Sequence, residues 1–228
     1  WRVTDRFELT AGVRYTEDDK EVTITAFPPS GPVQNTVAQS YNNTSFNITL
    51  DYNFTSDLAM YLRYGTGYRA GGINARAFRG QPYLPEEATV HEIGVKSEWW
   101  DRRLRFNASL YQTDYDNFQT GGPMGVDPDA GFVTDTINAG RARYRGFEAE
   151  LTIAPIEGLT LVADVAVVDP EFKSFDFGGA DVSDVARFIY ISEEQFHLGA
   201  HYQFAPWSFG TLSMHVDYSH MSGPYFSV

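Results

Sequence analysis

The segment SFNITLDYNFTSDLAMYLRYG, residues 45–65, alternates apolar and polar side chains along two stretches that a short break separates. The first stretch carries Phe46, Ile48, Leu50, Tyr52 and Phe54 in one phase, and the second carries Leu58, Met60, Leu62 and Tyr64. Successive side chains of a β-strand point to opposite faces, so this alternation is typical of strands with one apolar face. The break, Thr55-Ser56-Asp57, consists of turn-forming residues. The segment therefore predicts a β-hairpin with one apolar and one polar face.

The same alternation recurs along the whole chain and predicts nine strands. They cover residues 7–16, 45–54, 58–65, 93–99, 104–110, 147–154, 159–168, 195–204 and 211–218. Asp, Glu, Lys and Arg are absent from the apolar phase of all nine, whereas most of the strands carry them in the opposite phase. The strand at 93–99 is the least regular, because Ser97 falls in the apolar phase. The repetition predicts an all-β, antiparallel protein.

The connections between these strands alternate in length. Short ones, made of turn-forming residues, lie at 55–57, 100–102, 155–158 and from 205 onward. Long ones, rich in Gly, Pro and charge, lie around residues 17–44, 66–89, 119–140 and 169–192. Long structureless loops are uncommon in compact soluble domains, but short turns on one side and long loops on the other are typical of outer-membrane β-barrels. The connections therefore favour a transmembrane β-barrel.

Aromatic residues gather near the two ends of the predicted strands. Trp1, Trp99, Trp100 and Trp207 are at or beside the short-turn end. Several tyrosines fall toward the long-loop end, namely Tyr15, Tyr64, Tyr68, Tyr111, Tyr115 and Tyr218. Indole and phenol rings are favoured where apolar and polar surroundings meet, so the two bands predict two membrane interfaces.

The composition excludes several classes of protein. The net charge of −13 argues against nucleic-acid binding, which requires basic surfaces. The absence of cysteine excludes a disulfide framework and a thiolate metal site. No apolar run approaches the ~18 residues that a membrane helix needs. The mean hydropathy of −0.33 is compatible with membrane-spanning strands, because alternation dilutes their apolar residues.

We expect the apolar phase to face lipid and the polar phase to line a wet interior, since a basic side chain facing mid-bilayer costs about 2–4 kcal/mol. The first and ninth strands run in the same direction, so they cannot be antiparallel neighbours. We therefore expect the nine strands to be one portion of a larger barrel, with further strands outside this chain. A soluble lipocalin-like binding barrel, with its apolar phase inside, is the structural alternative.

Five segments, taken together in their order and spacing, carry a resemblance to a known family. They are LTAGVRYTEDDKEV (9–22), YLRYGTGYRAGGINAR (61–76), LPEEATVHEIGVKSEW (84–99), LRFNASLYQTDYDNFQ (104–119) and NAGRARYRGFEAELTIAPIEGLTL (138–161). Over nearly its whole length the chain resembles the C-terminal part of the β-barrel of TonB-dependent outer-membrane receptors. The resemblance implies a barrel of about twenty-two strands, of which residues 1–228 form a part, with a plug domain outside this chain.

The resemblance also implies a function and a location. The protein would lie in the bacterial cell outer membrane and would not be an enzyme. It would import a scarce nutrient, such as a ferric siderophore, a cobalamin or an oligosaccharide, using the proton gradient through TonB, which a segment outside this chain would contact. No cofactor is implied. The alternative function is that of a passive or substrate-specific porin, which has the same strand pattern.

The long loop from residue 68 to 89 is the candidate ligand-binding site. Its candidate residues are Tyr68, Arg69, Asn74, Arg76, Arg79 and Tyr83, with flexible glycines at Gly71 and Gly72. Guanidinium groups suit carboxylate or phosphate recognition, and aromatic rings suit sugar faces or catechols. The alternative interpretation is that these are ordinary solvated loop residues.

Three other groups of polar residues come into question as possible binding sites. His197 and His201 share a face but lie about 13 Å apart along one strand, so with His215 they predict a polar wall and no metal site. The acidic residues Asp169, Glu171, Asp176, Asp181 and Asp184 lack the spacing of a calcium loop. Arg141, Arg143 and Arg145 continue the lipid-facing phase above the membrane, where they could meet lipopolysaccharide phosphates. No local catalytic motif is present.

Overall fold

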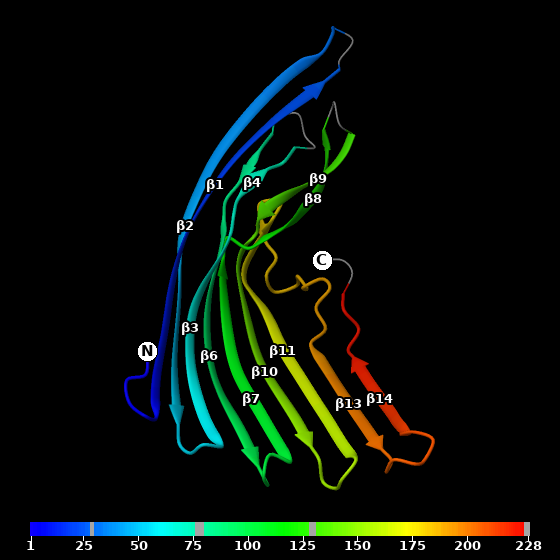
Figure 1. Ribbon diagram of the computed structural model, residues 1–228. Coiled ribbons are helices and arrows are strands. Elements are labelled where there is room, and N and C mark those ends of the chain that lie inside the picture. Colours follow the sequence, from blue (N-terminus) through cyan, green and yellow to red (C-terminus); the bar gives the residue numbers. More distant parts are fainter. Residues whose placement is uncertain (28–29, 76–79, 128–130, 226–228) are drawn as a thin grey trace.

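The computed structural model describes residues 1–27, 30–75, 80–127 and 131–225. Figure 1 shows one curved antiparallel sheet with small hairpins at one end. The main sheet consists of β1 Phe7–Ala26, β2 Val33–Asn53, β3 Leu58–Arg69, β6 Glu86–Trp99, β7 Leu104–Asp116, β10 Gly140–Ile153, β11 Leu159–Phe177, β13 Glu194–Gln203 and β14 Ser213–Met221, paired in that order. The smaller elements are β4 Gly72–Ile73 with β5 Pro82–Tyr83, β8 Gln119–Asp127 with β9 Gly131–Asn138, and β12 Ala180–Asp181 beside β11. Within the described ranges, no helix is long and apolar enough to cross a membrane.

The all-β, antiparallel prediction is confirmed, and each of the nine predicted segments overlaps one strand of the main sheet. The register places all the apolar phases on one face, which we call the apolar face, and the alternate residues on the other, the polar face. One row of register partners is Leu9, Leu50, Leu62, Ile93, Leu110, Phe147 and Val167. Leu62 and Leu110 are more than half exposed, at 53% and 57%. An apolar surface this continuous and this exposed matches a lipid-facing wall.

The height at which the apolar face ends shows that the strands are tilted. Heights are measured from the row of register partners that runs from Leu9 to Val167. On β1 the apolar phase continues to Tyr15, six residues beyond Leu9 toward the long connections. On β14 the apolar phase ends at Tyr218. Tyr218 lies opposite Leu198 of β13, and Leu198 lies opposite Ala163 of β11, which is four residues before Val167 of that row. The boundary thus shifts by about ten residues over the eight steps between neighbouring strands. With a rise of ~3.3 Å per residue and a strand spacing of ~4.8 Å, this shift corresponds to a tilt of about 40°, as in membrane barrels.

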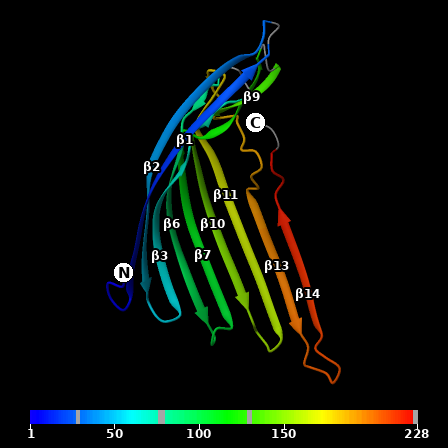
Figure 2. The same ribbon diagram turned by 45° about the horizontal axis from the view of Figure 1, so that its top comes forward.

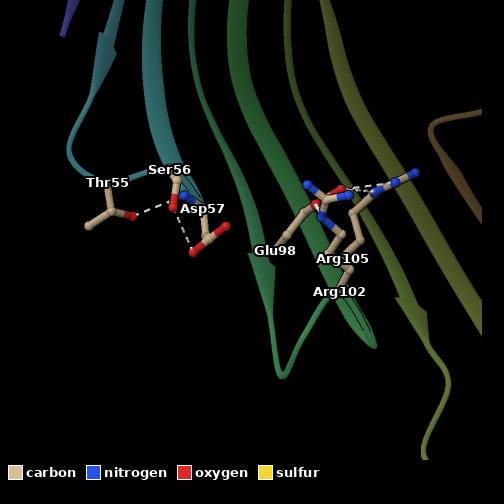
Figure 3. A network of polar contacts seen from close by, with 6 residues as sticks. All are labelled: Thr55, Ser56, Asp57, Glu98, Arg102 and Arg105. Carbon is tan, nitrogen blue, oxygen red and sulfur yellow. Dashed lines mark hydrogen bonds and ion pairs between the residues drawn. The ribbon is translucent and has the colours of Figure 1, made fainter. Parts of the chain in front are cut away.

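The short turns are held by local polar contacts, which Figure 3 shows at two neighbouring turns. The Ser56 hydroxyl donates to Asp57 (3.0 Å), and the amide of Asp57 donates to Thr55 Oγ1 (3.1 Å). In the next turn, Glu98 pairs with Arg105 (2.9 Å) and Arg102 (3.6 Å). The amide of Glu98 also donates to the carbonyl of Asp57 (2.8 Å), so the two turns are linked.

The turn between β6 and β7 is unusual in its backbone. Trp100, Asp101 and Arg102 all have positive φ values, at 54°, 53° and 67°. Residues other than glycine disfavour this left-handed backbone conformation. The bond from the amide of Arg103 to the carbonyl of Trp100 (3.0 Å) closes the turn, and the Glu98 pairs described above brace it.

The long connections are present where the sequence predicts them, but their expected loop character is wrong for much of their length. β1 and β2 pair without a break from Phe7 and Tyr52 to Ala26 and Val33, so they form a two-stranded ribbon that continues past the apolar face. Alternation continues in this ribbon, whose outer face carries cross-strand polar pairs such as Thr23 with Thr36 (2.9 Å). The sequence in this part is rich in Thr and Val, which favour strands, and charges outside the membrane do not oppose pairing.

Candidate ligand-binding site

The long connections meet at the end of the sheet opposite the short turns, which we call the loop end. In both views, Figures 1 and 2, β9 and the C-terminal end of β1 lie at this end. The β4–β5 hairpin contacts the ribbon on one side and β9 on the other. Three hairpins far apart in the sequence therefore form one assembly at the loop end.

The ribbon is fastened to the β4–β5 hairpin by two side chains from its inner face. The ammonium of Lys20 donates to the carbonyl of Gly71 (2.5 Å). The hydroxyl of Tyr41 lies 3.2 Å from the carbonyl of Gly72 and 3.1 Å from that of Tyr83. Tyr41 is buried, and burial, followed by the charge of Tyr83, raises the pKa of its hydroxyl, so Tyr41 is a neutral donor at neutral pH.

Gly71 and Gly72 are buried, and their role differs from the flexibility that the sequence suggests. A Cβ on Gly71 would lie 2.3 Å from the carbonyl oxygen of Tyr83 and 2.6 Å from the Tyr41 ring. A Cβ on Gly72 would lie 2.3 Å from the hydroxyl of Tyr83. The two glycines are therefore required for the close approach of backbone and rings.

Two amide side chains join the β4–β5 hairpin to β8 and β9. Asn74 exchanges two hydrogen bonds with the backbone of Thr136, at 2.9 Å and 2.8 Å. The amide of Gln119, which is buried, donates to the carbonyls of Ala70 (3.1 Å) and Leu84 (2.9 Å). These bonds use polar side chains to satisfy loop backbone, so the loop end is held together as a unit.

The six predicted ligand residues have different positions. Asn74 and Tyr83 are held within the loop assembly, as described above. Arg69 is exposed and lies opposite Glu86 in the register. Arg76 and Arg79 lie outside the described residues. The structure thus brings Asn74 and Tyr83 into one assembly and leaves Arg69 open to solvent.

Tyr68, the sixth predicted residue, lies in the phase of Leu62 and Tyr64 rather than in the polar phase. Burial, followed by the nearby carboxylate of Asp18, raises the pKa of the Tyr68 hydroxyl. The hydroxyl oxygen itself is buried and lies near Asp18 of the β1–β2 ribbon.

A cluster of aromatic rings supports the loop end beside these hairpins. Phe172 and Phe188 stack with centroids 3.7 Å apart, and both contact Phe118 at 5.7 Å. Tyr144 meets Phe188 edge-on at 5.1 Å. Phe175, which is fully buried, stacks on Phe172 at 4.5 Å. These contacts join β10 and β11 to the segment before β13, so the cluster is a small core under the loops.

Two arginines of β10 near the loop end have polar partners on β7. Arg143 pairs with Asp114, and Arg145 donates to Gln112 (3.1 Å). Burial alone would raise the pKa of Asp114, but the hydrogen bond and the charge from Arg143, together with Gln112, lower it.

The acidic residues of the β11–β13 connection serve the local turn. Asp181 accepts from the amides of Phe175 (3.1 Å) and Ser183 (3.0 Å), and Asp176 accepts from Gly179 (2.9 Å). The bonds from the amide and hydroxyl of Ser183 and the amide of Phe175 lower the pKa of Asp181. These carboxylates cap backbone amides, as short acidic side chains do in turns.

The polar face below the loop end carries interacting side chains of both signs. Tyr61 donates to Glu92, and Glu92 also pairs with Arg63 (3.5 Å). Closer to β14, the ring of His197 bridges the carboxylates of Asp164 and Asp217, each at 3.1 Å. Such a wall suits a wet interior and disfavours contact with hydrocarbon.

No sequence pattern marks Lys20, Tyr41 and Gln119 as parts of the loop end. Lys20 and Tyr41 fall in a stretch predicted to be loop, and Gln119 begins another one. The signal that could have found them is the pair Gly71-Gly72, since adjacent small residues indicate a close approach by another segment. The sequence alone does not show which segment makes that approach.

Comparisons with known proteins agree on one family. The family profile described as "TonB dependent receptor-like, beta-barrel" matches residues 1–227. Among curated relatives, the pesticin receptor of Yersinia enterocolitica is 26% identical over 153 residues, which cover 66% of this chain and 22% of the receptor. The ferric-pyoverdine M114 receptor PbuA of a Pseudomonas strain is 28% identical over 112 residues, 49% of this chain and 13% of that protein. The chain thus spans about a fifth or less of the length of these relatives.

Solved structures share the fold. The ferric yersiniabactin uptake receptor FyuA from Yersinia pestis superposes with a TM-score of 0.79 at 20% identity, covering 100% of this chain and 33% of FyuA. The copper transporter OprC gives a TM-score of 0.72 at 16% identity, covering 96% of this chain and 33% of that structure. At these identities the likeness establishes the architecture alone.

Proposed function

The chain belongs to the TonB-dependent receptor-like β-barrel family, and from this membership we propose that it is part of the wall of a transporter that imports a ferric siderophore. Members of this family are outer-membrane proteins of Gram-negative bacteria, and the chain is accordingly an outer-membrane protein. Uptake would be coupled to TonB and the proton gradient. The family match over residues 1–227 is the observation that carries the proposal.

The choice of a siderophore over a cobalamin or an oligosaccharide rests on the relatives and on the loop end. Several relatives are named for ferric siderophores, among them the ferric-pyoverdine receptor PbuA. The solved structures FyuA and BauA of Acinetobacter baumannii are likewise named as receptors for ferric yersiniabactin and ferric preacinetobactin. The loop end offers a fastened assembly with an exposed Arg69, and guanidinium groups suit the anionic oxygens of iron chelators. Arg76 and Arg79 belong to the same proposed ligand region by sequence.

The architecture supports a transporter in two further ways. The polar face carries Glu92, Arg63, Asp164 and His197 and suits the wet side of a barrel wall. The apolar face, with its tilted boundary, suits contact with lipid. We include outer-leaflet lipopolysaccharide among the proposed partners through Arg141, because Arg143 and Arg145 already have protein partners.

Uptake by the whole protein in cells tests the proposal. A strain lacking the gene would be supplied with ⁵⁵Fe bound to the siderophores that the host secretes under iron limitation. We expect uptake to require the gene and to stop with a proton uncoupler or without TonB. Uptake that persists with the uncoupler would instead indicate a passive porin. Gene-independent uptake of this iron would refute the siderophore assignment.

A further inference from the structure

Two histidines that are far apart in sequence face each other on the polar face near the short turns. His201 of β13 and His215 of β14 are direct register partners. Their ring centroids are 5.8 Å apart, with 54° between the ring planes. His197 is four residues from His201 along β13, whereas the antiparallel pairing brings His215 directly opposite. Cross-strand pairing therefore brings His215 close to His201, whereas His197 is too far along the same strand.

The separation of the rings fits a shared metal ion. A Zn–N bond measures about 2.0–2.1 Å, and the ring nitrogen lies about 1 Å from the ring centroid. Two imidazoles bound to one ion therefore have centroids roughly 4.5–6.5 Å apart, for angles at the metal between about 90° and 180°. The observed 5.8 Å lies inside this range. A stacked or edge-on ring contact without metal would give a similar distance, so further chemistry has to distinguish the two.

The groups around the pair supply that chemistry. Asp217 lies two residues after His215 on the same face, and its carboxylate contacts Nε2 of His215 (2.5 Å). Histidines that bind metals usually donate their second ring nitrogen to a carboxylate, which fixes the tautomer and the ring orientation. With Nε2 engaged by Asp217, Nδ1 of His215 is the nitrogen left for an ion. The same carboxylate also contacts His197 (3.1 Å), which holds it in place.

We propose that His201 and His215 bind a late first-row divalent ion, with Cu²⁺ preferred over Ni²⁺ and Zn²⁺, and with Asp217 orienting His215. Imidazole suits these ions, and Cu²⁺ binds nitrogen sites most strongly in this series. In the described ranges, no group of three or more His, Cys, Asp or Glu side chains is already arranged to hold a metal. The site is therefore a two-imidazole site whose remaining positions are filled by water. It lies on the polar face, away from the loop end where the ligand is proposed to bind.

The experiment uses the whole protein, purified in detergent micelles, and Cu²⁺ as the probe. Electron paramagnetic resonance counts the nitrogen donors of the bound ion, and titration gives its affinity. We expect one bound ion with two nitrogen donors in the parent protein. His201→Gln and His215→Gln should each weaken binding about tenfold or more and leave at most one nitrogen, and Asp217→Asn should weaken it by a comparable factor.

His220→Gln is the matched control, since His220 lies on β14 in the opposite phase and its ring contacts Phe196. This variant should bind copper as the parent does. Equal affinity in the parent and in His201→Gln would overturn the proposal. If the histidine variants fail to assemble, the parent spectrum still decides, because a bound ion with fewer than two nitrogen donors, or no bound ion, refutes the two-imidazole site.

Discussion

Tyr41 and Tyr83 lie 42 residues apart in the sequence, and the hydroxyl of Tyr41 donates to the carbonyl of Tyr83 across 3.1 Å. This bond joins the β1–β2 ribbon to the β4–β5 hairpin. It fixes the hairpin that contains two of the predicted ligand residues, Asn74 on one side and Tyr83 on the other. The ribbon thus acts as a buttress for the loop end.

Replacing Tyr41 with Phe should loosen this buttress. The change removes the one hydroxyl proton that the carbonyls of Gly72 and Tyr83 share, at a cost of about 1 kcal/mol. Hydrogen exchange should become faster in residues 17–26 and 72–75. Tyr15→Phe is the control, because that side chain is 62% exposed, and it should leave exchange unchanged. Unaltered exchange in Tyr41→Phe would show that other contacts hold the ribbon.

Gly71→Ala should disrupt the entry to the β4–β5 hairpin directly. The added Cβ would lie 2.3 Å from the carbonyl oxygen of Tyr83, a backbone atom, so the hairpin must shift, and overpacking of this kind costs about 1–3 kcal/mol. Proteolytic cleavage near the hairpin should increase and ligand uptake should fall. Gly12→Ala is the matched control, since its Cβ would meet nothing within 4 Å. Similar behaviour of the two variants would contradict the close-packing role.

Two substitutions on β2, one on each face, test which face of the sheet contacts lipid. Leu50→Asp places a charge in the middle of the apolar face and should reduce assembly in the outer membrane, at a cost on the order of 1–2 kcal/mol, below the cost of a basic residue. Asn47→Asp, on the polar face of the same strand, lies beside Arg63 and should be tolerated. The measurement is the amount of folded protein in outer-membrane fractions. Equal tolerance of both changes would argue against lipid on the apolar face.

The Asp114–Arg143 pair should make the loop end sensitive to acid. The folded pKa of Asp114 lies below its ordinary value of 3.8, so this carboxylate binds protons less readily in the folded state. Its stabilisation is therefore fully present above the ordinary value and is lost as the pH falls through the folded pKa. Because both side chains are about 30% exposed, the effect should be about 1 kcal/mol. Asp114→Asn should lower stability at pH 7 and flatten its decline below about pH 4, as measured by hydrogen exchange at the loop end.

The aromatic cluster should govern the order of the segment before β13. Phe188→Ala removes a ring that is 8% exposed and that stacks on Phe172, at a cost of about 3–5 kcal/mol. Exchange should increase across residues 178–193 while the strands in the membrane keep their protection. Val185→Ala serves as the control, since Val185 is 72% exposed. Exchange that increases equally in both variants would exclude a supporting role for the cluster.

From patterns within single segments one can predict the nine strands of the main sheet, the apolar side of each, and the ends that carry short turns or long connections. Period-two alternation is a local property, and exclusion of charge from hydrocarbon acts on each residue separately, so both can be read from single strands. Arg69 is predicted to lie in a connection, but it is the last residue of β3 and lies opposite Glu86, because strand pairing continues past the predicted end of that strand.

Which distant segments meet depends on contacts that form only in the folded chain. Residues 17–26 and 33–44 form a paired ribbon because their backbone groups find partners across the hairpin. Asn74 is engaged by Thr136, and His201 faces His215, only because neighbouring strands adopt one register. Register and loop contacts are fixed by hydrogen bonds between segments that are far apart along the chain, and no pattern within a single segment contains that information.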